Sequence, residues 1–386
     1  MTKSQNNRLI ILTFFVMALL GFLESIRGAV IPSIQGFYGI GYKDIGIFLF
    51  IASLGYISSN FFGASMSYSL GQKKLIFIGT LCIAAGIVGM FVSQNFFLFL
   101  FFVAILNYGY GTFSISANTL TPIIFEKNQG MMMNLLHFFY GLGATLGPRY
   151  AGIALKNHWS WQKIYSMNLP VLIIFLALAL MSIFPRIEEK DKEEKSSFKA
   201  IISNPEVLLF SFILGFYVAA ELGVANWLTT YLQDGKKIDP VQSPTYLSLF
   251  FGIFAFGRLV GGFIVEKLGY FKSILGFLIT AAVLFTAGTI FSNQWIFLIS
   301  LSGFFFSIIY PTTFALLLKV FGKEAGKVMG VVITISSGLN MIGNAIIGQM
   351  NDIIGLEFGF RLVTVYLLIS IILIFILKKR IGSQVQ

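Results

Sequence analysis

Long apolar segments alternate with short polar segments along the whole chain. Apolar runs of about 18 or more residues recur, and this pattern is typical of helices that span a membrane. The polar breaks between the runs predict twelve transmembrane helices. We place them at 9–36, 45–69, 75–93, 96–125, 131–155, 164–185, 207–233, 244–268, 274–291, 295–321, 328–353 and 361–379. The predicted fold class is an all-α polytopic membrane protein.

The composition supports this fold class. Of the 386 residues, 56% are apolar and 11% are charged, whereas a soluble domain has roughly 25% charged residues. The first helix is not expected to be a cleavable signal peptide. Its apolar stretch is too long, and GFLESIRG at 21–28 offers no small-residue cleavage site.

The net charge of +11 is spread over many short loops, so it does not form a nucleic-acid patch. If the N-terminus is cytoplasmic, most Lys and Arg residues lie in cytoplasmic segments. The positive-inside rule therefore predicts that both termini are cytoplasmic. We expect the protein to lie in the cytoplasmic (inner) membrane.

The longest polar stretch, RIEEKDKEEKSSFK at 186–199, has mixed charge and no catalytic pattern. We interpret 186–206 as a cytoplasmic linker between an N-terminal six-helix bundle at 1–185 and a C-terminal one at 207–386. The halves also repeat short motifs at a nearly constant offset. These are LGF at 20–22 and 214–216, SLGQKK at 69–74 with KLGYFK at 267–272, and FEKNQG at 125–130 with FGKEAG at 321–326.

Two parallel six-helix repeats, with a binding site near the midplane, describe the major facilitator architecture. FGRLVGGFIVEKLG at 256–269 resembles the loop signature of that superfamily. The resemblance implies that Gly262 allows close helix packing and that Glu266 and Lys267 latch the cytoplasmic face. The first-half copy departs from the signature, because Tyr68 and Ser69 stand where an acid and a base are expected.

Three further stretches resemble the fucose and glucose/galactose permease branch: SIIYPTTFALLL at 307–318, GYGTFSISAN at 109–118 and NLLHFFYGLGATLGP at 134–148. The resemblance implies uptake of a sugar. Both acids of that branch are missing, because Ser114 and Gly28 occupy their places. Proton coupling through those positions is therefore not implied.

Charged residues inside the predicted helices are costly to bury, so each is a functional candidate. Glu24 and Arg27 lie in the first helix, and Glu221 lies in the seventh, which is its repeat partner. We hypothesise that Arg27 lies between Glu24 and Glu221, so that one uncompensated negative charge can hold a proton or Na⁺. The alternative is a self-neutralising Glu24–Arg27 pair at i, i+3, with Glu221 facing water.

Polar residues also gather on several predicted helices. In the fourth helix they repeat every three or four residues and so share one face, which predicts either a cavity wall or contacts between helices. Amide, hydroxyl and aromatic groups suit a neutral polyol. The candidate substrate-binding residues are Asn107, Tyr110, Ser114, Asn118, Asn134, His137, Tyr310, Asn340, Asn344 and Trp227.

Two of these assignments and one cation keep an alternative. Trp227 can stack on a sugar or belong to an interfacial aromatic belt. His137 can be a buried, hydrogen-bonded residue or a ligand, and Arg258 can be a structural or gating partner or contact the substrate. Two histidines and one cysteine, distant in sequence, argue against a metal site.

The chain has no GxxxxGK[ST] loop for ATP and no nucleophile–base constellation. We therefore predict a secondary transporter that is not an enzyme and needs no cofactor. Its expected partners are a sugar-like small molecule, H⁺ or Na⁺ and the lipid bilayer, with no nucleic acid, and we expect a monomer. The alternatives are an exporter of drugs or lipids and a non-transporting membrane sensor.

Overall fold

The structure of the protein is a computed structural model that describes residues 3–125, 129–185 and 201–385. Within this part of the chain, every element is helical. Ten helical segments are long and apolar enough to cross a membrane. The helices α2 and α5 are of similar length and complete a set of twelve long segments, as the sequence predicts.

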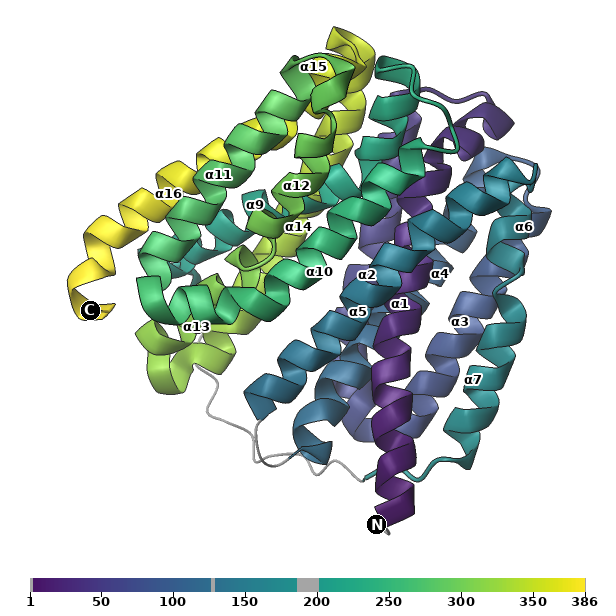
Figure 1. Cartoon of the computed structure of the whole chain (residues 1–386). Helices are drawn as coiled ribbons and strands as arrows, with labels where there is room; N and C mark the ends of the chain where they lie inside the picture. The colour runs from purple at the N-terminus through teal and green to yellow at the C-terminus, as the bar shows by residue number, and fades with distance from the viewer. Residues whose placement is uncertain (1–2, 126–128, 186–200, 386) are drawn as a thin grey trace. The chain divides into compact units, whose positions relative to one another are not determined.

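The first six segments precede the linker (Figure 1). They comprise α1 (Lys3–Tyr38), α2 (Tyr42–Leu70), α3 (Gln72–Val92), α4 (Phe96–Ile124), α5 (Gln129–Lys156), and α6 (Trp161–Ser166) followed by α7 (Leu169–Met181). Polar side chains start two of these helices. Asn95 accepts a hydrogen bond from the backbone N–H of Leu98 at the start of α4, and Ser160 does the same for Lys163 at α6.

The remaining six segments follow the linker. They comprise α9 (Pro205–Thr230) with η1 (Tyr231–Gly235), α10 (Ser243–Leu268), α11 (Tyr270–Ile290), η2 (Asn293–Trp295) with α12 (Phe297–Phe306) and α13 (Ile309–Phe321), η3 (Gly322–Glu324) with α14 (Ala325–Ile354), and α15 (Leu356–Phe360) with α16 (Leu362–Val385). Asn204 caps α9 by accepting from the N–H groups of Glu206 and Val207.

Two predicted spans are interrupted, which corrects the expectation of continuous helices. The span 164–185 breaks between α6 and α7, and the span 295–321 breaks between α12 and α13. Pro170 and Pro311 lie in the first turn of α7 and α13. Proline has no N–H to donate, and its ring clashes with the carbonyl four residues earlier, so each helix restarts at the proline.

The helices form two compact units. The first contains Met1–Gly41, Ile47–Lys192 and Pro240–Ser248, and the second contains Tyr42–Gly46, Glu193–Asp239 and Leu249–Gln386. Each unit therefore includes one short segment from a helix that belongs mainly to the other. Residues 186–200 of the predicted linker lie outside the described residues, so the predicted boundary at 186–206 stays a prediction.

Small residues set the closest helix contacts in the first unit. There α1 packs along α5, and α3 packs against α4 (Figure 1). A methyl group at Gly21 would meet the backbone of Tyr140, and one at Gly143 would meet the backbone of Ala18. Glycine at these positions lets the α1 and α5 backbones touch, which is how helices pack in a membrane.

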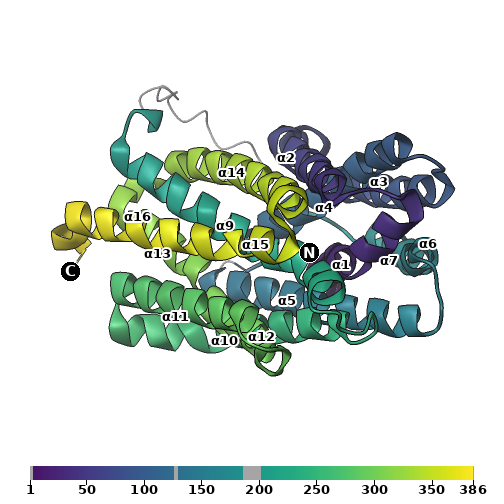
Figure 2. The same cartoon turned by 90° about the horizontal axis from the view of Figure 1, so that it is seen from above.

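The second unit repeats this arrangement. Here α9 lies between α14 and α16 (Figure 2). A methyl group at Gly343 of α14 would lie 2.9 Å from the Cβ of Ala219 on α9. The repeat extends to the backbone, because Gly71 and Gly269 precede α3 and α11 with φ of 77° and 78°. Glycine adopts this left-handed conformation without the strain of a side chain.

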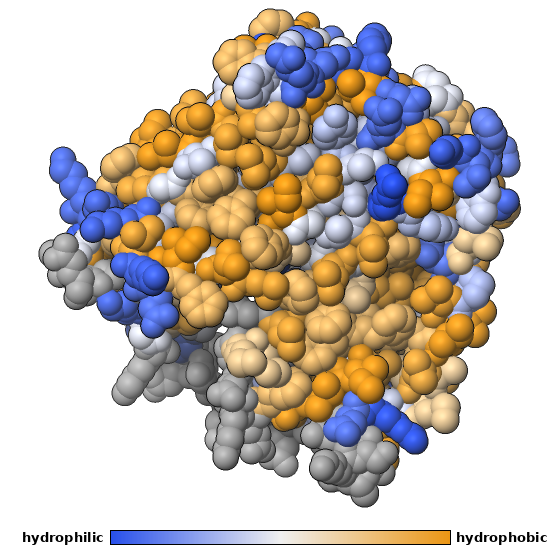
Figure 3. All heavy atoms as spheres, in the orientation of Figure 1, coloured by the Kyte–Doolittle hydropathy of each residue, from blue (hydrophilic) through white to orange (hydrophobic). Residues whose placement is uncertain are grey.

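Large apolar side chains cover the outer surfaces of the helices. Phe97, Phe101, Ile173, Met181 and Phe263 are among the most exposed. On the face shown in Figure 3, hydrophobic side chains cover the middle stretches of α5, α10 and α12, while hydrophilic ones gather near the helix ends. Surfaces of this kind are stable in lipid rather than in water, so the chain is a multi-pass membrane protein.

Candidate functional site

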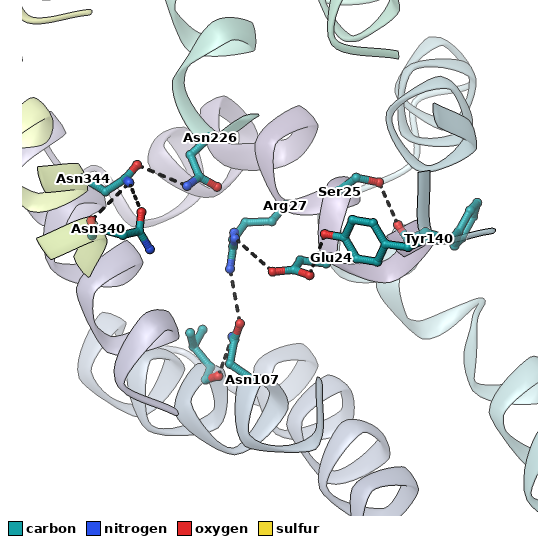
Figure 4. A network of polar contacts seen from close by, with 10 residues as sticks. Glu24, Ser25, Arg27, Asn107, Tyr140, Asn226, Asn340 and Asn344 are labelled. Atoms are coloured by element: carbon teal, nitrogen blue, oxygen red, sulfur yellow. Dashed lines mark hydrogen bonds and ion pairs between the residues drawn. The ribbon is translucent and has the colours of Figure 1, made fainter. Parts of the chain in front are cut away.

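The first unit contains a buried ion pair on α1. Arg27 Nη2 lies 3.8 Å from Glu24 Oε1, and the two side chains are only 12% and 17% exposed. The hydroxyl of Tyr140 on α5 donates to Glu24 Oε2 at 2.9 Å (Figure 4). The contact between Glu24 and Arg27, which the hypothesis and its alternative both require, is therefore present. The Tyr140 hydroxyl gives the Glu24 carboxylate a second stabilising contact.

Asn107 holds the guanidinium of Arg27 from α4. The amide nitrogen of Asn107 donates to the Val103 carbonyl at 2.8 Å, so its oxygen is left to accept from Arg27 Nη1 at 3.2 Å. A backbone carbonyl can only accept. It therefore fixes the orientation of this amide, with the oxygen of Asn107 toward Arg27, and the role of Asn107 in solute binding stays a prediction.

A small cavity lies beside this pair. Arg27, Asn107, Tyr110 and Tyr165 line it together with apolar side chains, and its volume of about 10 Å³ suits about one water molecule. The buried hydroxyl of Tyr110 has no hydrogen-bond partner among the described residues. This cavity is too small for a monosaccharide.

The second unit contains a chain of three amides. Asn226 on α9 donates from Nδ2 to Asn344 Oδ1 at 3.3 Å, and Asn344 donates from Nδ2 to Asn340 Oδ1 at 2.9 Å (Figure 4). Asn340 and Asn344 are candidates from the sequence. Asn226 is not, although a lone amide in an otherwise apolar membrane helix is a detectable signal.

Glu221 and Arg258 share neighbours in the second unit. Both lie close enough to Tyr217 and Tyr310 to act electrostatically on those hydroxyl groups. Tyr217 donates its hydroxyl to the Phe306 carbonyl at 2.6 Å. The Arg258 guanidinium lies over the Phe254 ring, 4.4 Å from its centroid. Each unit therefore brings one acid, one arginine and tyrosines together.

The other candidates from the fourth and fifth predicted helices are placed less tightly. Asn118 donates to the Ser114 carbonyl at 2.8 Å and to its hydroxyl at 3.3 Å, so these two residues pair within α4. His137 is half-buried on α5. The structure does not describe the side chain of Asn134.

Trp227 is fully buried, at 0% exposure, and its indole nitrogen has no hydrogen-bond partner among the described residues. The ring of Trp227 therefore lies in the interior of the second unit rather than in a belt at the lipid surface. Stacking on a sugar would require the structure to open around it, and this role stays a prediction.

The loop signature is only partly as expected. Glu266 and Lys267 are both exposed at the end of α10 and form no ion pair among the described residues. The expectation of close packing at Gly262 is wrong, because no described atom lies within 4 Å of a methyl group built there. Gly261 is the packed glycine, since a methyl group there would meet Ile308.

The second unit also binds the start of α2. Asp352 on α14 accepts from the backbone N–H groups of Tyr42 and Lys43 at 3.1 and 2.7 Å. The Tyr42 hydroxyl donates to Asp234 at 3.0 Å, and burial together with Asp234 raises the pKa of Tyr42 above its usual value. The first N–H groups of a helix have no partner within the helix. The Asp352 carboxylate therefore stabilises the start of α2.

The family model described as Major Facilitator Superfamily matches residues 13–338. The chain therefore belongs to the major facilitator superfamily. It is a transporter rather than an enzyme. Among the described residues, no three His, Cys, Asp or Glu side chains are grouped to hold a metal ion.

Named relatives are distant but cover most of the chain. A Helicobacter pylori J99 protein named as a glucose/galactose transporter is 22% identical over 88% of this chain and 86% of its own length. A TsgA homolog of Yersinia enterocolitica is 23% identical over 82% of this chain and 81% of its own.

Solved structures share the fold. A bacterial homolog of the human lysosomal transporter Spinster aligns with a TM-score of 0.80 at 14% identity, covering 100% of this chain and 99% of its own. The transporter FucP aligns with a TM-score of 0.68 at 16% identity, covering 95% and 98%. The predicted architecture of two six-helix repeats is confirmed.

Proposed function

We propose that this protein is a secondary transporter that carries a sugar or a related small polar solute by alternating access. The buried polar groups support this proposal most directly. Three amides, an ion pair and several tyrosine hydroxyls lie within helices whose outer surfaces are apolar. Polar and charged side chains within membrane helices are costly, and they commonly mark solute or ion pathways.

The chemistry of these groups favours a neutral, hydroxyl-rich solute. Amides donate and accept hydrogen bonds, as sugar hydroxyls do, and aromatic rings pack against apolar C–H faces. The relative named as a glucose/galactose transporter and the structural neighbour titled D-xylose-proton symporter point to the same substrate class.

We further propose that transport is coupled to H⁺ or Na⁺, and that Glu24, Arg27 and Glu221 form the coupling machinery. The charge count supports this, since two acids and one arginine carry a net negative charge that a proton or Na⁺ can balance. The proposal includes a monomer in the cytoplasmic membrane, with both termini cytoplasmic as the distribution of Lys and Arg predicts.

Uptake into proteoliposomes tests the function and separates it from its rivals. The purified protein is reconstituted and supplied with labelled monosaccharides, disaccharides and N-acetyl sugars, with and without H⁺ or Na⁺ gradients. Accumulation of a sugar supports the proposal. Efflux of an amphipathic dye without sugar uptake identifies an exporter, and no flux of either identifies a non-transporting protein.

A further inference from the structure

The backbone carbonyl of Asn340 fixes the direction of each hydrogen bond among the three amides of Asn226, Asn340 and Asn344. Asn344 Nδ2 lies 2.9 Å from the side-chain oxygen of Asn340 and 3.3 Å from its backbone carbonyl. A backbone carbonyl only accepts hydrogen bonds. The nitrogen of Asn344 must therefore face Asn340, and its oxygen must face Asn226.

The other two amides follow from this orientation. Asn226 supplies the N–H group that the oxygen of Asn344 requires, at 3.3 Å. Asn340 turns its oxygen toward Asn344, so its own amide nitrogen points elsewhere. For that nitrogen the described residues offer no acceptor, and Asn340 is 7% exposed whereas Asn344 is 2% exposed. Asn340 is thus the member of the chain that a solute can reach.

We infer that Asn226 and Asn344 are positioning residues that fix Asn340 as a hydrogen-bond donor to the transported solute. Both polar atoms of Asn344 are already used, so it is not expected to contact the solute itself. The group that Asn340 recognises must be an acceptor, such as a hydroxyl, ring or carbonyl oxygen. This inference rests on the proposed function only where it names a solute.

Contacts between α14 and its neighbouring helices hold the three amides in place. The hydroxyl of Ser336, one turn before Asn340 on α14, lies 3.0 Å from the Ser211 carbonyl on α9 and 2.6 Å from the Val332 carbonyl of its own helix, and these two acceptors share its one hydrogen. The Tyr366 hydroxyl on α16 donates to the Gly343 carbonyl at 2.9 Å. The α14 backbone is therefore bound to both neighbouring helices on either side of Asn340, and a rigid support of this kind keeps a binding group in one geometry.

The first experiment needs no solute. Protein labelled with ¹⁵N-asparagine gives side-chain amide signals, and the Asn340 signal is the one that Asn340→Gln removes. Asn226→Leu should move the Asn340 signal, although these two side chains are not bonded to each other. Ser336→Ala, which removes a hydroxyl from the contact between the same two helices, should leave the Asn340 signal in place. An unmoved Asn340 signal in Asn226→Leu overturns the inference.

The second experiment uses the sugar that the uptake screen identifies, with each hydroxyl replaced in turn by hydrogen or fluorine. Fluorine can accept a hydrogen bond but cannot donate one. In the wild type, at the position facing Asn340, the deoxy analogue should bind about five- to 150-fold more weakly and the fluoro analogue should lose less. Asn226→Leu and Asn344→Leu should abolish this difference, whereas Ser336→Ala should keep it.

The two failures are distinguishable. If no sugar binds the wild type, the proposed function is wrong. The amide signals still decide whether Asn226 and Asn344 fix the orientation of the Asn340 amide. If a sugar binds and Asn344→Leu preserves the difference between deoxy and fluoro analogues, the three amides only hold α9 and α14 together, and the inference is wrong.

Discussion

Tyr140 on α5 donates its hydroxyl to Glu24 on α1, while Arg27 lies on the other oxygen of the same carboxylate. The acid is therefore held by its own helix and by a neighbour. Because α1 and α5 touch through Gly21 and Gly143, the tyrosine reaches the carboxylate directly. A shift between these helices would change the contacts of Glu24, and this links helix packing to the proposed coupling site.

Removal of the Tyr140 hydroxyl tests how much this contact contributes. Tyr140→Phe keeps the ring and leaves one oxygen of a buried carboxylate without its donor, so we expect a loss of about 1–3 kcal/mol of unfolding free energy. Tyr150→Phe is the matched control on α5, because its hydroxyl donates to the Ile164 carbonyl, a neutral partner. Unfolding in detergent gives both values. Equal losses would show that the charge of Glu24 adds nothing to the Tyr140 bond.

The ion pair can be tested by removing its members singly and together. Arg27→Ala leaves Glu24 buried without its cation, which typically costs about 3–5 kcal/mol. If the pair only neutralises itself, Glu24→Gln should restore stability in the Arg27→Ala background. If Arg27 is shared with Glu221, transport should return in Arg27→Ala/Glu221→Gln. Additive effects in both double variants would contradict either form of pairing.

Two glycines on α1 give a matched test of helix packing. At Gly21 a methyl group would strike the Tyr140 backbone, whereas at Gly36 it would meet no described atom within 4 Å. Gly21→Ala should therefore cost about 1–3 kcal/mol, and Gly36→Ala should stabilise by about 0.5–1 kcal/mol. Unfolding midpoints in detergent compare the two. A Gly21→Ala variant as stable as the wild type would show that α1 and α5 separate without cost.

The fold could be read from the sequence because membrane-spanning helices need long apolar runs, and the chain repeats such runs at regular intervals. The breaks at Met167–Asn168 and Ser307–Ile308 were harder to predict. A proline inside an apolar run can kink a helix or restart it. The choice depends on neighbours that a single sequence does not place.

The candidate site was only partly predictable. Glu24 and Arg27 stand out because charges are rare in membrane helices, and their spacing predicts the observed pair. Tyr140 and Asn107 become ligands of that pair only through the packing of α5 and α4 on α1. Asn226 is detectable as a lone amide in an apolar helix, but its bond to Asn344 is not, since one amide does not reveal which helix it faces.

The solute contacts can be tested by alanine variants. Asn118, Asn340 and Tyr310 each combine a polar group with a helix that turns inward in this architecture. Loss of one hydrogen-bonding partner should cost about 1–3 kcal/mol of binding, roughly a five- to 150-fold weaker affinity. Affinity is measured by ligand-induced thermal shift, which follows from mass action. If all three variants bind as the wild type does, the site lies elsewhere.

The last prediction concerns Glu221 as the coupling residue. Its neighbours on α9, VAA before and LGVA after, are apolar, and the acid lies near Tyr217 and Tyr310, which Arg258 also neighbours. A contact with Arg27 that forms in one conformation and breaks in another would let Glu221 bind and release a proton or Na⁺ in each cycle. Glu221→Gln should therefore abolish uphill accumulation of substrate in proteoliposomes while it preserves counterflow exchange.

The matched control is Glu206→Gln on the same helix, because Glu206 pairs with the exposed Arg380 at 3.4 Å near the start of α9. That variant should accumulate substrate as the wild type does, since a solvent-exposed pair contributes little. Two results would contradict the assignment. If Glu221→Gln still concentrates substrate against its gradient, another residue carries the coupling ion. If the wild type itself only equilibrates the substrate, the protein is a facilitator, and Glu221 then acts by positioning Arg27 rather than by exchanging an ion.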